Sequence, residues 1–146
     1  INSNKDTRNP NNVVMTHDNK FYNSCKVDKL EDVTIPYNTN VIGIDEAQFF
    51  TDLIPFVNKQ LERGMKIIVA GLDGDSSQNK FGQILDLIPL ADTYTKKYAL
   101  CHYCQNGTPG VFTHRIVDSN SQIMIGAQGK YVSLCRSCLD STKFNV

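Results

Sequence analysis

The sequence predicts an α/β fold with a parallel sheet, joined to a smaller zinc-binding lobe. Two observations predict this fold. Apolar runs at residues 41–44 and 65–72 flank a segment with helical periodicity, and four of the five cysteines form two C-x-x-C pairs. We expect the α/β core to span residues 1–98 and the zinc-binding lobe to span residues 99–146.

Composition excludes several classes of function. The 146 residues carry fifteen basic and fifteen acidic side chains, a balance that argues against a cationic nucleic-acid clamp or a polybasic membrane binder. No apolar run approaches the roughly 20 residues that cross a bilayer. The chain has five cysteines, four of them in two C-x-x-C pairs, and this pattern favours a protein from a reducing compartment over a secreted protein with disulfides. We therefore expect a cytoplasmic protein that binds neither membranes nor nucleic acid.

The first forty residues are polar and include nine asparagines. This composition favours a surface-exposed or partly disordered lead-in segment.

A βαβ unit is predicted over residues 41–72. The run 41–44 has the character of a buried strand, and a helix is expected from Thr51 or Asp52, as the capping residue, to about Arg63, with Gly64 ending it. The run 65–72 is then a second buried strand. A short return between the strands favours parallel pairing, and active sites in such sheets lie beyond the carboxyl ends of the strands.

Two segments connect this unit to the cysteines. Residues 81–91 are mostly apolar and form either a helix or a packed loop. Residues 93–100 alternate in polarity and are expected to form a strand that leads into the first cysteine pair.

The cysteine pairs indicate a structural zinc site. Two residues between cysteines let one turn direct both thiolates at a single ion, and two such turns complete a tetrahedron with no open position. A redox dithiol, two disulfides or an iron–sulfur site are the alternatives. The intervening excursion, residues 105–134, is nearly uncharged and rich in Gly and Pro, which favours a loop around a small ligand over a nucleic-acid-binding ribbon. The expected ligands are Cys101, Cys104, Cys135 and Cys138.

Asp45 and Glu46 follow the first predicted strand directly. They are either ordinary polar residues at a strand end, or one of them organises a magnesium shell while the other handles a substrate proton. Phosphoryl transfer requires mainly positioning and charge compensation, which such a pair can supply.

Several motifs, in the same order along nearly the whole chain, resemble those of cellular-type (type II) thymidine kinases. They are the acidic strand motif at residues 41–50, Leu-Asp-Gly at 72–74, Phe81-Gly82, the segment 87–92, both cysteine pairs, 125–127 and Tyr131. Residues 5–8 and 16–18 are similar to the segment that follows the second strand in that family. The resemblance implies a P-loop-kinase-like parallel core and a zinc lobe with a lasso loop.

The resemblance also implies transfer of the terminal phosphate of ATP to the 5′-hydroxyl of thymidine. By motif, Glu46 is the expected general base, Asp45 and Asp6 act through a Mg²⁺ shell, and Arg8 stabilises charge on the transferred phosphate. A homotetramer is the implied assembly. The residues expected to contact thymidine are Phe49, Leu72, Phe81, Thr113 and Tyr131, with the lasso residues Gln122, Ile123 and Gly126 closing over the base. Glu46 is thus expected to share a cavity with the nucleoside.

Two departures from the family pattern stand out. The 146 residues contain no G-x-x-x-x-G-K-[ST] phosphate loop, so we expect the chain to be a fragment of a longer kinase and not competent by itself. Ser76 or Ser77 stands where the family often has an aromatic residue. A kinase that acts on another deoxynucleoside is therefore an alternative function. A zinc-ribbon module that binds nucleic acid or protein is the rival from another class.

Overall fold

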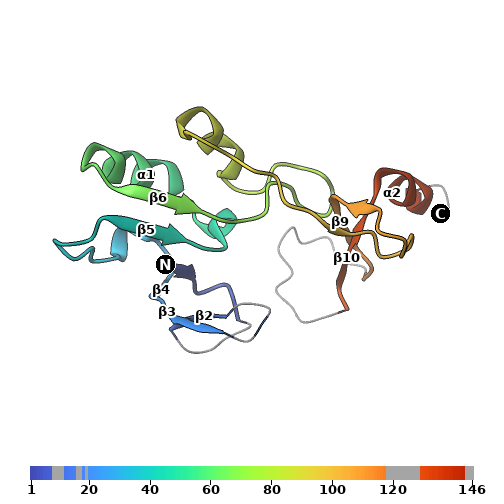
Figure 1. Cartoon of the computed structure of the whole chain (residues 1–146), viewed down its shortest axis with the longest axis horizontal. Coiled ribbons are helices and arrows are strands. Elements are labelled where there is room, and N and C mark those ends of the chain that lie inside the picture. Colours follow the sequence, from blue (N-terminus) through green and yellow to red (C-terminus); the bar gives the residue numbers. More distant parts are fainter. Residues whose placement is uncertain (8–11, 16–17, 19, 118–128, 144–146) are drawn as a thin grey trace. The chain divides into compact units, whose positions relative to one another are not determined.

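The computed structural model describes residues 1–7, 12–15, 18, 20–117 and 129–143 (Figure 1). They form two compact units, each described here by itself. The first unit comprises Ile1–Asp73 and Phe81–Ala91, and the second comprises Gly74–Lys80 with the described residues from Asp92 onward.

The first unit contains the predicted βαβ arrangement. Strand β5 (Val41–Ile44) pairs in parallel with β6 (Lys66–Val69), and helix α1 (Leu53–Glu62) connects them. Helix α1 ends where Gly64 adopts a positive φ of 74°, a conformation that glycine adopts without steric cost. The predictions of two parallel strands joined by a helix are therefore confirmed, but β6 is shorter than the predicted run 65–72. The expectation that both strands are buried was wrong, because Val41 is 51% and Ile68 57% exposed.

The predicted N-cap position of α1 was right, but the hydrogen bond expected from the side chain of the capping residue is not formed. Asp52 is the N-cap residue, but its carboxylate caps nothing and instead accepts a hydrogen bond from the backbone N–H of Glu31, at 2.9 Å. The N–H of Ile54 in the first turn donates to the side-chain oxygen of Gln83, at 3.1 Å. A residue distant in sequence thus satisfies the helix terminus, which a local pattern cannot reveal.

The first forty residues contribute strands to this unit, contrary to the lead-in segment that composition favoured. Asn2 and Ser3 are 1% exposed, and the pairing of their strand satisfies backbone groups that burial would otherwise leave without partners. Leu30 is fully buried because it packs in the hydrophobic core. The described elements are β1 (Asn2–Ser3), β2 (Val13–Met15), β3 (Phe21–Asn23), β4 (Lys26–Val27) and the 3₁₀-helix η1 (Leu30–Asp32).

Two of these strands, β1 and β4, extend the parallel arrangement. β1 pairs in parallel with β4, and β2 pairs antiparallel with β3. The N–H of Ile1 donates to the carbonyl of Gly43, and the carbonyl of Ile1 accepts from the N–H of Asp45, which is the parallel pattern beside β5. The order β4, β1, β5, β6 therefore places four carboxyl strand ends at one edge.

One hydrophobic core stabilises the first unit. It gathers side chains from η1, β5, α1 and the short 3₁₀-helix η2 (Ala47–Phe49), and Ile84 and Leu87 of the 3₁₀-helix η3 (Ile84–Leu90) pack against it. The segment 81–91, which was open between helix and loop, therefore contains a 3₁₀-helix. The buried residues are Leu30, Ile42, Ile44, Ala47, Phe50, Leu53, Phe56, Val57 and Met65.

The second unit is built around the cysteine pairs. The strand expected over residues 93–100 was wrong over most of its length. Only β7 (Ala99–Leu100) is paired, and residues 93–98 are exposed and pair with no strand among the described residues. The other elements are β8 (Pro109–Gly110), β9 (Phe112–Arg115), β10 (Tyr131–Leu134) and α2 (Arg136–Lys143). β7 pairs with β8 and β9 with β10, both antiparallel.

No helix in the described part of the chain has the length and apolar character that crossing a bilayer requires.

Candidate functional site

The carboxyl ends of β1 and β5 bring the predicted acids of the first unit to one edge of the sheet. Asp6 lies three residues beyond β1, and Asp45 and Glu46 come directly after β5. β1 and η2 contact each other, and the Lys5 ammonium lies 6.0 Å from the centre of the Phe49 ring. The segments that carry Asp6 and Glu46 are therefore neighbours.

Asp6 is held in place by its surroundings. Its side chain is 6% exposed, and its Oδ2 accepts a hydrogen bond from Asn2 Nδ2 at 3.0 Å. The Lys26 ammonium donates to its backbone carbonyl at 2.6 Å. Lys26 was missed by sequence reasoning, because it is 20 residues away and only the β1–β4 pairing brings it near.

Glu46 has an unusual backbone conformation. It is half-buried, and its φ and ψ are 51° and 38°, the left-handed region. That conformation costs a non-glycine residue roughly 1–2 kcal/mol, so the surrounding contacts must stabilise it. The turn starts η2 and directs the chain so that Gln48 Nε2 donates to Glu46 Oε2, at 2.7 Å.

The predicted aromatic contacts of the first unit lie together. The Phe49 and Phe81 rings pack edge to face, with centroids 5.7 Å apart and an interplanar angle of 89°. Phe81 is 8% exposed, and its N–H donates to the carbonyl of Asp73 at 3.1 Å. Leu72, by contrast, is 46% exposed.

In the second unit, the predicted nucleoside contacts share one face of a strand pair. Tyr131 lies opposite Arg115 and Thr113 opposite Ser133 in the β9–β10 ladder, so all four point to the same side. Arg115 stacks on the Tyr131 ring at 5.4 Å from its centre. The other face carries Leu134 and packs on the core of this unit. Arg8, Gln122, Ile123 and Gly126 lie outside the described residues.

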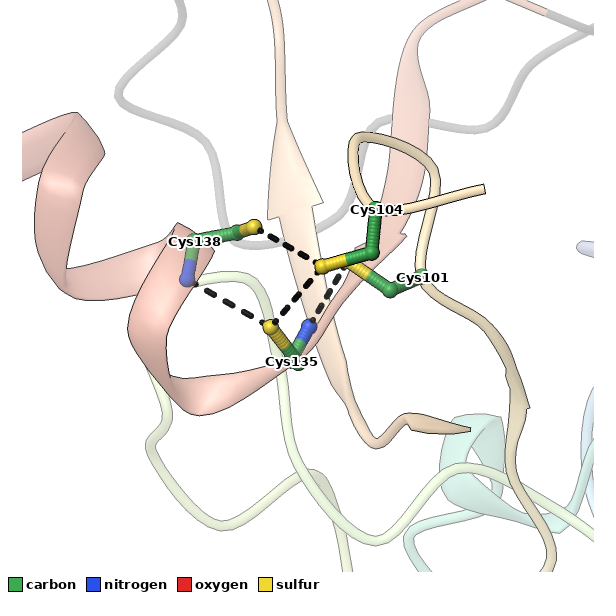
Figure 2. A group of neighbouring side chains, drawn as sticks. All are labelled: Cys101, Cys104, Cys135 and Cys138. Carbon is green, nitrogen blue, oxygen red and sulfur yellow. Dashed lines mark hydrogen bonds between the residues drawn. The ribbon is translucent and has the colours of Figure 1, made fainter. Parts of the chain in front are cut away.

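The four predicted cysteine ligands converge (Figure 2). Their sulfur atoms all lie within 4.8 Å of one another. A tetrahedral zinc with Zn–S bonds of about 2.3 Å places sulfurs about 3.8 Å apart. Cys104 Sγ is 3.8 Å from Cys135 Sγ and 3.5 Å from Cys138 Sγ, so the donor set fits such an ion.

Backbone groups support this cluster. The N–H of Cys135 donates to Cys101 Sγ at 3.3 Å, and the N–H of Cys138 donates to Cys135 Sγ at 3.5 Å, where α2 begins. The first of these bonds lowers the pKa of Cys101 to about 6. The side-chain hydrogen bond with Cys104 raises the pKa of Cys138 to about 12.

Gln48 is a second site residue that sequence reasoning missed. It stands within the acidic strand motif but carried no assigned role. The sequence offered one indication of a role, since Gln48 is a polar residue two positions after Glu46 in a motif that is otherwise mostly apolar. That Gln48 is buried became evident only from the structure.

Comparison with known proteins identifies a family. The thymidine kinase family model matches residues 1–139. Thymidine kinase 1 of Dictyostelium discoideum is 39% identical over 142 residues, which cover 94% of this chain and 62% of that protein. The thymidine kinase of Myxoma virus (strain Uriarra) is 39% identical over 139 residues, covering 94% of this chain and 76% of that protein.

A vertebrate relative agrees. The cytosolic thymidine kinase of Gallus gallus is 38% identical over 135 residues, covering 92% of this chain and 59% of that protein. The chain thus spans about three fifths of the Dictyostelium and chicken relatives and about three quarters of the viral one. With a family match over nearly its whole length, this chain belongs to the thymidine kinase family.

Proposed function

We propose that the protein containing this chain is an ATP-dependent thymidine kinase, which transfers the terminal phosphate of ATP to the 5′-hydroxyl of thymidine. The observation that carries the proposal is Glu46, a half-buried carboxylate held at the carboxyl end of a parallel strand in a chain of this family. A general base needs this fixed position to accept a proton from a hydroxyl. A P-loop-kinase-like core over residues 1–98 and a zinc-binding lobe over residues 99–146 are part of the proposal.

In the proposed mechanism, Glu46 accepts the proton of the 5′-hydroxyl as that oxygen attacks the terminal phosphorus. The bond between this phosphorus and the bridging oxygen breaks, and ADP leaves with that oxygen. Arg8 stabilises the charge that develops on the transferred phosphate. Asp45 and Asp6 would hold Mg²⁺, because carboxylate oxygens are the ligands this ion prefers. When bound, Mg²⁺ offsets the charge of the triphosphate.

The proposed thymine pocket joins apolar side chains with a backbone lasso. Phe49 and Phe81 already pack against each other, which supports a fixed aromatic wall. A slot for the thymine methyl group separates thymine from uracil by only about 1–3 kcal/mol, so uracil nucleosides should be rejected incompletely. The proposed contacts are Phe49, Leu72, Phe81, Thr113, Tyr131, Gln122, Ile123 and Gly126.

The four cysteines would hold a structural zinc ion, since four sulfurs leave no position for substrate. A homotetramer and a cytoplasmic location complete the proposal, and both rest on resemblance to the family.

Replacing Glu46 by Gln in the full-length protein tests the role of the base. The amide keeps the shape of the side chain but cannot accept the proton, so kcat should fall by about 100-fold or more. Thymidine binding, measured by calorimetry, should be unchanged. Undiminished turnover would refute the assignment of Glu46.

A further inference from the structure

We infer that Gln48 is a positioning residue, which holds the Glu46 carboxylate in the orientation needed for proton transfer. This inference rests on the proposed function, because it assigns to Gln48 a role that operates only through Glu46. The side-chain carboxamide of Gln48 makes one hydrogen bond through its oxygen and another through its nitrogen.

The two hydrogen bonds fix which way the carboxamide points. The backbone N–H of Leu72 lies 3.0 Å from Gln48 Oε1, and an N–H can only donate, so this end of the amide must be its oxygen. The NH₂ end then faces Glu46, where Nε2 lies 2.7 Å from Oε2. Gln48 therefore connects the segment after β6 to the carboxylate after β5.

Burial makes this connection rigid. Gln48 is only 4% exposed, so its two hydrogen bonds are shielded from water. A Cβ added to Gly71 would lie 2.6 Å from Gln48 Oε1, and one added to Gly82 would overlap the backbone carbonyl of Gln48. The chain thus has glycine at two positions where any side chain would displace Gln48.

The consequence for chemistry follows from the freedom of a glutamate side chain. Three rotatable bonds allow its carboxylate to occupy many positions, whereas proton transfer requires one oxygen within hydrogen-bond reach of the hydroxyl. A donor fixed to the backbone at Leu72 restricts the carboxylate of Glu46 before substrate arrives. This restriction affects the rate of the chemical step and leaves nucleoside affinity unaltered.

The test is a double-mutant cycle in the full-length protein with Gln48→Met and Glu46→Gln. Methionine fills a similar volume but has no donor for the carboxylate. Gln48→Met alone should lower kcat roughly 10-fold to 100-fold, with the KM for thymidine unchanged. In the Glu46→Gln background it should change kcat by less than about twofold, because the base it orients is gone.

The outcomes separate this inference from the proposed function. If Glu46→Gln keeps full turnover, the assignment of the base fails. If Glu46→Gln is impaired but Gln48→Met has no effect, or has the same effect in both backgrounds, Gln48 is merely structural and the inference is overturned.

A second pair of variants applies if Gln48→Met does not fold. Gly71→Ala pushes on Gln48 Oε1 from the neighbouring segment, whereas Gly43→Ala on β5 adds a methyl group with nothing within 4 Å. Gly71→Ala should lower kcat at least about fivefold more than Gly43→Ala, at constant KM for thymidine. Equal kcat values for the two variants would overturn the inference.

Discussion

The two units of the molecule are stabilised in different ways. Among the described residues, the first unit buries nine hydrophobic side chains in one core, while the core of the second contains three, Cys101, Leu134 and Leu139. Small units with few buried side chains usually need a metal or disulfides to be stable. The proposed catalytic acids therefore lie in the unit with the larger hydrophobic core, whereas the second unit has a cluster of four sulfurs that fits a metal ion in place of such a core.

Removing one zinc ligand should have the largest effect. Cys101→Ser should abolish stoichiometric zinc and unfold the second unit, because a site of this type contributes an apparent binding free energy of about 10–16 kcal/mol. Metal analysis and limited proteolysis measure the two effects. Cys25→Ser is the control, since Cys25 is exposed and lies outside the cluster. Full zinc content in Cys101→Ser would contradict the ligand set.

A cavity in the first core should have a smaller and purely local effect. Leu53→Ala removes a fully buried side chain of α1 and should reduce the free energy of unfolding by about 2–5 kcal/mol. Leu61→Ala, on the same helix but 41% exposed, is the matched control and should cost much less. Denaturant unfolding gives the stabilities. Loss of zinc from Leu53→Ala would show that the two units are not stabilised separately.

The smallest effect is the pH dependence of zinc affinity. The pKa of Cys138 is raised to about 12 by its hydrogen bond with Cys104, so at neutral pH zinc must displace that proton. Zinc affinity should therefore rise at least about tenfold per pH unit between pH 6.5 and 8, about 1.4 kcal/mol per proton.

Cys101 adds a second pH dependence below that range. Its pKa is lowered to about 6, so it is ionised above that value and takes up a proton as the pH falls below it. The dependence should become steeper there. Competition with a chelator, extended from pH 8 to below the Cys101 pKa of about 6, measures both slopes. An affinity that does not change with pH would show that no proton is released.

The sequence predicted those parts of the fold that local patterns determine. Hydrophobic periodicity identified β5, α1 and β6, and Gly64 marked the helix end, because these signals depend on neighbouring residues. The C-x-x-C spacing likewise predicted the convergence of the four sulfurs. Each of these patterns is local, so each could be recognised without knowing the fold.

Features that depend on distant partners could not be predicted in this way. The strands within the first forty residues are stabilised by β5 and by one another, so a polar composition concealed them. Alternation over residues 93–100 predicted a strand, but of these residues only Ala99 and Leu100 pair with a strand in the described part of the chain. The side chain of Gln48 is oriented by a hydrogen bond from the backbone N–H of Leu72, which is 24 residues away in sequence. In all three cases the presence or absence of a partner distant in sequence decides the structure, and local preference does not.

The central claim is that a protein containing this chain phosphorylates thymidine. The most direct measurement incubates the full-length protein with thymidine and ATP labelled in the terminal phosphate, and follows the label. The account predicts label on the 5′-position of thymidine, in amounts equal to the ADP formed. Absence of labelled nucleotide, together with tight, salt-dependent binding of oligonucleotides, would contradict it and support a nucleic-acid-binding zinc module instead.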